Sequence, residues 1–362
     1  MLYVPARNPD TCSLSVSHNV IAGYSLIEPG EEWEEIVAAF RALGGVADNI
    51  RLGFGQNGRG LFPIDPGQPF HLRVPENLMC PIEDISFYGD RIGVRERSTI
   101  RTPECAFFER YANAVSWGGG GRQEMAALIS AFDALPNEVR ALLASDFGMA
   151  PWLEGDATAR MQAQYLQSRA VSIRGRDVLI PLFELTNHNA RGSEWSAEGG
   201  LEVTGEASGE ICVTYGLLHD PFSMFHRYAI ASREPIAFSM PMKVQVGAIP
   251  VSIARTFELE KRGERVTPQV IYTNEGLALS FLMLGQSIVP RLPRKMFVEL
   301  MKPLSVANVD EEFDAVVHAN ATKFLKLLAA LDPHRGELII VMRKMALYQL
   351  EAMTFCVGAR EV

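Results

Sequence analysis

A change from apolar to polar residues between positions 178 and 189 constrains this chain more than any other feature of its sequence. Residues 178–185 have the composition of a buried strand, and the polar run Thr186-Asn187-His188-Asn189 follows directly. A second strand is predicted over residues 210–214, and Tyr215-Gly216 stands at its end. Two strand ends that meet would place an Asn-His pair and a tyrosine around one polar site within an apolar wall.

Length and charge narrow the class of protein. At 362 residues the chain is expected to hold two domains, or one domain with an insertion. Its residues are 48% apolar, so a full hydrophobic core is possible without disulfides or metal ions. The net charge of −9 argues against a nucleic-acid partner held by broad phosphate neutralisation. The same charge suits a cationic substrate such as a lysine-rich segment.

The cysteines and the apolar runs indicate the compartment. Five cysteines are scattered along the chain without CxxC or CxH spacing, at Cys12, Cys80, Cys105, Cys212 and Cys356. This pattern predicts reduced thiols in a cytoplasm and no zinc site. No stretch of 18 apolar residues occurs and the N-terminus lacks a signal pattern, so we expect a cytoplasmic protein with no membrane partner.

The first 80 residues predict a helix followed by glycine-rich strands. A helix is expected over residues 31–43, because Trp33, Ile36, Val37, Phe40 and Leu43 form one apolar stripe. Residues 52–62 then contain Gly58-Arg59-Gly60, which predicts a tight turn between two short strands. A further short strand leads to Val74-Pro75 and Leu78.

The rest of the chain alternates between helical and β-like patterns. Helices are predicted over residues 106–117, 123–135, 137–147 and 157–168, and the sheet resumes at residue 170. Residues 220–228 predict a short helix capped by Asp220, with Pro221 in its first turn. Beyond about residue 240 we expect β-like stretches over 244–253, a long helix through 313–331 and another over 337–355.

The order of these motifs resembles the SET domain, the fold of lysine methyltransferases. The Gly-x-Gly turn at Gly58 and Gly60, the Val-Pro-x-x-Leu segment, the Asn187-His188 pair and Tyr215-Gly216 follow one another as in that family. The closest resemblance is to the branch of the Rubisco large-subunit lysine methyltransferase. The resemblance covers about residues 33–80 and 168–230, whereas the helical insert and the C-terminal region match only in position and helical character.

The resemblance implies an α+β fold, with a SET-domain β-fold, a helical insert and a mostly helical C-terminal domain. The expected boundaries are an N-terminal arm and helix over residues 1–50, a SET domain over 51–240 with its insert at about 102–168, and a substrate-binding-like domain over 241–362. The implied activity is S-adenosylmethionine-dependent N-methylation, with a protein lysine as the expected acceptor. The oligomeric state is left open.

The family's functional residues carry over to matching positions. Asn187 and His188 would hold the donor, although an Asn-His pair also suits a turn or a structural site. Gly58 and Gly60 would let the backbone approach the donor, because glycine has no Cβ. Arg59 and Arg169 would pair with the donor carboxylate, or would be surface arginines.

Two tyrosines complete the implied site. The hydroxyl of Tyr215 would orient the acceptor amine as the catalytic group, and the alternative is a ring that packs in the core. The ring of Tyr228 would attract a cation, or would belong to the core. His219 and His226 are expected to be partly exposed, and no metal ligands are assigned.

Two departures from the family pattern keep other functions open. Glu184 stands where the family has a shorter acid, and Ile230 stands where it has an aromatic ring. A non-catalytic SET-like protein-binding module is therefore one alternative. A methyltransferase of a histidine or a small-molecule amine is another. A metal-dependent hydrolase would require a bound metal ion and is the least favoured.

Overall fold

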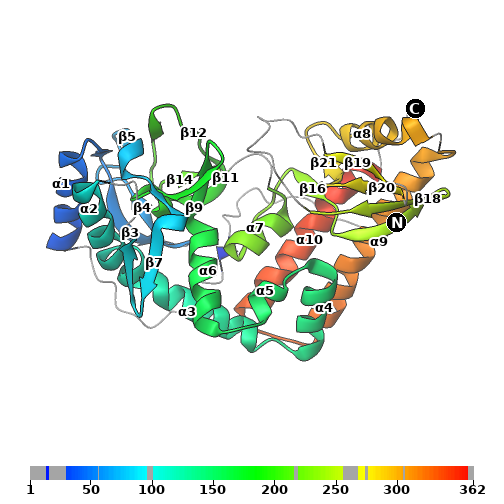
Figure 1. The fold of residues 1–362 in the computed structure, drawn as a ribbon, viewed down its shortest axis with the longest axis horizontal. Helices are drawn as coiled ribbons and strands as arrows, with labels where there is room; N and C mark the ends of the chain where they lie inside the picture. Colours follow the sequence, from blue (N-terminus) through cyan, green and yellow to red (C-terminus); the bar gives the residue numbers. More distant parts are fainter. Residues whose placement is uncertain are drawn as a thin grey trace.

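The computed structural model describes residues 14–15, 30–55, 57–95, 101–215, 219–255, 268–273, 276–304 and 306–357. Strands and helices occur throughout these ranges, which confirms the predicted α+β class. In Figure 1 the strands of the first half gather at one end of the molecule, and the C-terminal helices and strands form the other end. The domain boundaries given above remain a prediction.

The N-terminal part is built on helix α1 and an antiparallel sheet. Helix α1 (Glu31–Ala42) buries Trp33, Ile36, Val37 and Phe40, as its apolar stripe predicted. The sheet has the order β12 (Trp195–Ser196), β13 (Gly200–Gly205), β5 (Phe70–Pro75) and β2 (Val46–Asp48). The predicted glycine-rich hairpin is confirmed, with strands β3 (Arg51–Gly55) and β4 (Gly58–Phe62), but its turn lies between Gly55 and Gly58, so Arg59 and Gly60 belong to the strand.

The predicted strand over residues 178–185 is only partly correct. Strand β10 (Arg176–Leu179) ends before Pro181, and Phe183–Leu185 forms a 3-10 helix. Proline has no N–H to continue a ladder, and Leu182 has a φ of 64° that turns the chain out of the strand direction. Strand β10 pairs with β6 (Cys80–Pro81) and β9 (Ala170–Ile173).

The polar run begins a strand instead of ending one. Strand β11 (Asn187–Ser193) pairs in parallel with the short β14 (Cys212–Val213), with Asn187 opposite Cys212 and His188 opposite Val213. The predicted strand over 210–214 is therefore shorter, and Ile211 joins Leu61 through an isolated bridge. Parallel pairing brings the start of one strand beside the other, so Tyr215 follows close to the Asn-His pair. A separate hairpin joins β7 (Ile85–Tyr88) and β8 (Arg91–Val94).

The helical insert is confirmed, with one additional helix. Its helices are α2 (Thr102–Ala114), α3 (Arg122–Asp133), α4 (Asn137–Phe147), α5 (Ala150–Leu153) and α6 (Ala157–Arg169). The four-residue α5 was not predicted, since one turn leaves too little periodicity to detect. Trp117–Gly121 form a π-type turn between α2 and α3, in which Gly119 and Gly120 leave helical geometry.

The C-terminal region contains more strands than its helical pattern predicted. After α7 (Pro221–Tyr228) and β15 (Ile230–Ala231), which pairs with β1 (Leu14–Ser15), a four-stranded sheet follows with the order β17-β18-β20-β19. Its strands are Met242–Val246, Ile249–Ile253, Gly276–Leu279 and Val270–Thr273. Strands β16 (Ile236–Phe238) and β21 (Met283–Gln286) form a second pair. The helices are α8 (Leu292–Met301), α9 (Val309–Leu331) and α10 (Glu337–Val357).

The insert and the C-terminal helices share one hydrophobic core. Phe147 of α4 lies 5.7 Å from the ring of Phe222 and 5.1 Å from that of Phe324, measured between ring centroids. Asp220 caps α7 by accepting a hydrogen bond from the Ser223 amide at 2.8 Å, as predicted, and it also pairs with Arg255. The short helix α7 is thereby fixed between the two ends of the molecule (Figure 1). No helix of the described residues is long and apolar enough to cross a membrane.

Candidate functional site

One cavity brings together six of the eight residues predicted for the site. They are Arg59, Arg169, Asn187, His188, Tyr215 and Tyr228. The full lining comprises Asn57, Arg59, Glu124, Met125, Leu128, Gln164, Ser168, Arg169, Glu184, Leu185, Asn187, His188, Tyr215, Tyr228 and Ile230. The residues come from β4, the insert helices, β11 and α7, so only the folded chain assembles them.

Gly58 and Gly60 are not among the residues that line the cavity. Gly58 has a φ of 83° and makes the hairpin turn, which a residue with a Cβ would strain. A Cβ placed on Gly60 would lie 2.5 Å from Glu210 Oε1 and 2.9 Å from Asn187 Nδ2. Gly60 therefore makes room for the Asn187 side chain, and the backbone contacts predicted for both glycines remain predictions.

We expect Gly60→Ala to weaken the hydrogen bonds that hold the Asn187 side chain and to lower the stability of the fold. The new methyl group must push aside the Glu210 carboxylate, at a cost of about 1–3 kcal/mol in the free energy of unfolding. Gly209→Ala is the matched control, since a methyl group at that position would meet no side chain or backbone atom within 4 Å beyond its chain neighbours. Urea denaturation of both variants checks this expectation, and equal midpoints would contradict it.

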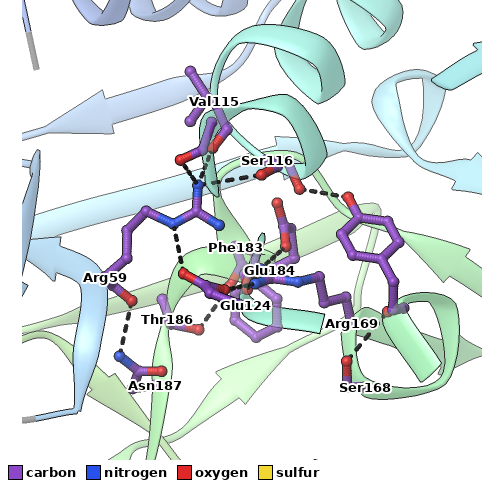
Figure 2. A network of polar contacts seen from close by, with 12 residues as sticks. Arg59, Val115, Ser116, Glu124, Ser168, Arg169, Phe183, Glu184, Thr186 and Asn187 are labelled. Atoms are coloured by element: carbon purple, nitrogen blue, oxygen red, sulfur yellow. Dashed lines mark hydrogen bonds and ion pairs between the residues drawn. The ribbon is translucent and has the colours of Figure 1, made fainter. Parts of the chain in front are cut away.

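Asn187 is held by a backbone oxygen and a carboxylate. Its Nδ2 donates to the carbonyl of Arg59 at 3.1 Å and to Glu210 Oε1 (Figure 2 shows the first contact). Glu210 also accepts from Asn57 Nδ2 at 2.8 Å. Burial raises the pKa of Glu210, while the hydrogen bonds from the two asparagines oppose that rise. The amide of Asn187 is thus fixed in orientation at the cavity wall.

His188 has a supporting position, because both of its ring nitrogens have partners in the protein. The amide N–H of Tyr215 donates to Nδ1 at 3.2 Å, so Nε2 carries the proton and donates to Glu234 Oε1 at 3.0 Å. The side chain is buried. His188 therefore connects β11 to the chain after β14 and to Glu234, which sequence reasoning did not identify.

Arg169 is embedded between two carboxylates. It pairs with Glu184 Oε2, and its Nη2 lies 3.1 Å from Glu124 Oε2. The hydroxyl of Tyr111 donates to the other oxygen of Glu184 at 2.5 Å. Burial favours the neutral form of Glu184, but the charge of Arg169 and the hydrogen bonds outweigh it and lower its pKa. Glu184 is longer than the acid of the family pattern, but it is still charged and still forms an ion pair with Arg169.

Arg59 extends into the turn between α2 and α3. Its Nη1 donates to the carbonyl of Ser116 at 3.2 Å and also to that of Val115 (Figure 2). The same Nη1 donates to the carbonyl of Gly119 at 2.7 Å. Its Nε lies 3.5 Å from Glu124 Oε1. With only 7% of its surface exposed, Arg59 is not the surface arginine that was one of its two predicted alternatives.

Tyr215 directs its hydroxyl at the segment that precedes the Asn-His pair. The hydroxyl donates to the carbonyl of Thr186 at 2.7 Å. Burial raises the pKa of Tyr215 above its ordinary value, and the nearby Tyr228 adds to the rise. The phenol therefore stays neutral at physiological pH, and its oxygen keeps lone pairs that can accept a hydrogen bond.

Tyr228 forms an aromatic wall with its neighbours. Its ring centroid lies 4.6 Å from that of Tyr215 and 5.9 Å from that of His219. Ile230 lines the same cavity, and it is a buried aliphatic residue where the family pattern has a ring. The wall therefore keeps two tyrosine rings, and aromatic faces of this kind can attract a cation.

We expect the free energy of unfolding to fall between pH 6.5 and about pH 4 because of His219 and His226. Burial lowers both pKa values to about 4, and the charges of Arg227 and Arg255 respectively add to the effect. Both histidines are neutral when folded but take up protons when unfolded near pH 6.5, so the stability present above that pH is lost as pH falls. The loss at pH 5 is about 2 kcal/mol for each histidine.

Urea denaturation at pH 7.5 and pH 5 measures this loss. The double variant His219→Gln/His226→Gln should show a much smaller loss. The exposed His318→Gln should behave as the unmodified chain does. An equal pH dependence in all three proteins would contradict the assignment.

Glu124, Glu210 and Glu234 are the charged residues that sequence reasoning missed. Each one reaches the site from a segment without a recognisable motif, namely α3, the turn before β14 and the turn after β15. A lone glutamate in a helical pattern predicts a solvated face, so only the fold reveals these roles. Within the described ranges, no three His, Cys, Asp or Glu side chains form a group that could hold a metal ion.

Comparisons with known proteins give a distant likeness. No protein-family model and no curated protein matches the sequence. The fold is similar to the structure of Rubisco LSMT bound to AdoMet, with 12% identity over 91% of each chain and a TM-score of 0.45. It is also similar to the SET domain of LSMT bound to lysine and AdoHcy, with 11% identity over 91% of each chain and a TM-score of 0.44. Both TM-scores are below 0.5, so this likeness alone says nothing about function.

Proposed function

We propose that this chain is a SET-like, S-adenosylmethionine-dependent N-methyltransferase that acts on a protein lysine. The proposal rests mainly on one observation. Arg169, Asn187, Tyr215 and Tyr228, chosen from motifs in the sequence, line the same cavity although they come from separate elements of the fold. If each of the four residues had only a structural role, there would be no reason for all of them to line one cavity.

The residues present fit the donor's amino-acid head group. Arg59 Nη2 and Arg169 Nε are buried guanidinium nitrogens without a hydrogen-bond partner. Such groups are costly to bury unpaired, and a carboxylate is the acceptor that suits them. Asn187 would contribute an oriented amide. When bound, S-adenosylmethionine would supply a methyl group activated by a sulfonium centre.

The protein would position the acceptor and control its protonation. A lysine of pKa about 10.4 has to lose a proton before it can act as a nucleophile. Removal of the amine from water in the cavity lowers its pKa. The Tyr215 hydroxyl, which donates to Thr186, presents lone pairs that would accept a hydrogen bond from the amine N–H and orient its free pair. Alignment of this kind accounts for up to about 7–11 kcal/mol of a barrier.

A non-catalytic binding module is the main alternative. The observation that favours it is Ile230, which stands where the family pattern has an aromatic ring. Methylation of a histidine or a small-molecule amine by the same site is a further alternative. The cytoplasmic location and the protein partner are likewise proposals.

The proposal is tested by adding the purified chain and radiolabelled S-adenosylmethionine to a lysate of the native organism and following transfer of the methyl group. Mass spectrometry of the labelled species should identify methyl-lysine in a protein. Labelled methylhistidine or a labelled small amine would support the corresponding alternative instead. If the active chain incorporates no more label than the heat-inactivated chain does, that result would contradict methyltransferase activity.

A further inference from the structure

Glu124 occupies a position in the cavity that the motif residues do not explain. It comes from helix α3 of the insert, whereas the two arginines it contacts come from β4 and the end of α6. Figure 2 shows its carboxylate in the space between the Arg59 and Arg169 guanidinium groups. Its two oxygens face Arg59 Nε at 3.5 Å and Arg169 Nη2 at 3.1 Å. A carboxylate that bridges two arginines has the position and charge of a bound ligand carboxylate.

The bridge leaves much of the arginines' hydrogen-bonding capacity unused. Arg59 Nε, Arg59 Nη2 and Arg169 Nε are all buried without a hydrogen-bond partner. The 3.5 Å contact to Arg59 is an ion pair without a hydrogen bond. Unpaired buried donors carry a free-energy penalty, so a carboxylate that fits both guanidinium groups better gains by replacing Glu124.

The chain next to Glu124 is a glycine turn that brings Glu124 and Arg59 close together. Helix α3 starts directly after the four glycines 118–121, and Gly120 has a φ of 127° that favours glycine. A Cβ on Gly119 would lie 3.2 Å from Arg59 Nη1, so the same turn lets the arginine approach closely. A Cβ on Gly118, Gly119 or Gly121 would lie 2.9 Å or less from a carbonyl oxygen of Asn113, Ala114 or Ser116, so the glycines let α3 and Glu124 begin close to the end of α2 and to Arg59.

We propose that Glu124 is an internal competitor for a ligand carboxylate, and that the α-carboxylate of an amino-acid-bearing ligand displaces it from Arg59 and Arg169. For the donor, this inference rests on the proposed function. Glu124 then determines donor affinity. The donor carboxylate can pair with the arginines only in those molecules in which Glu124 has left them, so the apparent affinity is proportional to the fraction of such molecules. The opposite role, in which Glu124 holds the ligand ammonium group, predicts the opposite sign for every charge-removing variant.

The first test is a calorimetric titration of the full chain with S-adenosylmethionine. Glu124→Gln keeps the size of the side chain and removes its charge, and we expect it to lower the donor Kd by about tenfold. Glu32→Gln, which removes an exposed carboxylate on α1, is the matched control and should leave the Kd unchanged. A Kd that is unchanged or higher in Glu124→Gln would overturn the inference while donor binding itself still stands.

The second test does not use the donor. Glu124→Ala leaves a gap between the arginines, and sodium acetate should raise the thermal unfolding midpoint of this variant more than sodium chloride of equal ionic strength. The unmodified chain, in which Glu124 fills the gap, should respond equally to both salts. Equal responses in Glu124→Ala would overturn the inference. If the donor binds no variant but acetate stabilises Glu124→Ala selectively, the proposed function fails and the role of Glu124 stands.

Discussion

Tyr215→Phe is expected to reduce the methyl-transfer rate by about 10²–10³-fold, with the donor Kd nearly unchanged. The substitution keeps the ring that packs 4.6 Å from Tyr228 but removes the hydroxyl assigned to the acceptor amine. The Thr186 carbonyl also loses its hydrogen-bond donor, so the free energy of unfolding should fall by about 1 kcal/mol. Initial rates of label incorporation and donor titrations measure both quantities.

The separation of rate from donor affinity is the informative part of this result. A residue with only a structural role would change both together, or neither. Tyr272→Phe, on an exposed strand of the C-terminal sheet, is the control and should leave both unchanged. Full turnover in Tyr215→Phe would show that the hydroxyl does not act at the reacting centre.

Glu184→Gln should cause the largest loss of stability, about 3–5 kcal/mol in the free energy of unfolding. The Glu184 side chain is only 2% exposed and pairs with Arg169, whose side chain is 14% exposed. Removal of the charge leaves the buried guanidinium with Glu124 as its remaining ion-pair partner among the described residues, and it disturbs the hydrogen bond from Tyr111. Urea denaturation at neutral pH measures the change.

A double-mutant cycle separates this pair from its surroundings. Arg169→Met removes the other charge, and the double variant should be less destabilised than the sum of the two single variants. Glu83→Gln breaks the ion pair with Arg176, in which both side chains are more than half exposed, and it should cost less than about 1 kcal/mol. Similar losses in Glu184→Gln and Glu83→Gln would contradict the assignment of a buried charge network.

The fold could be predicted from the sequence wherever one local pattern determined the structure. The apolar stripe of α1 and the Asp220 cap of α7 depend on side chains within one helix, and both are confirmed. The strand predicted over 178–185 is correct only to Leu179, because Pro181 and the positive φ of Leu182 end the ladder there. Apolar composition indicates burial there, but it does not distinguish a strand from a buried 3-10 turn.

The site could be predicted only in part, for a related reason. Asn187 and Tyr215 follow from motifs, and the parallel pairing of β11 with β14 then brings them together. Glu124 and Glu210 have no motif, since each acts through partners 23 to 153 positions away, such as Asn187 and Asn57. Charge pairing between distant segments depends on packing that no local pattern records.

Calorimetry with S-adenosylmethionine tests most directly the claim that this cavity binds the donor. We expect the unmodified chain to bind one equivalent, and Asn187→Ala to lose binding, because this amide is fixed at the wall by the Arg59 carbonyl and Glu210. Asn189→Ala, two residues further along β11 and outside the cavity lining, should bind as the unmodified chain does. No heat of binding with the unmodified chain, or equal binding by Asn187→Ala, would contradict the account.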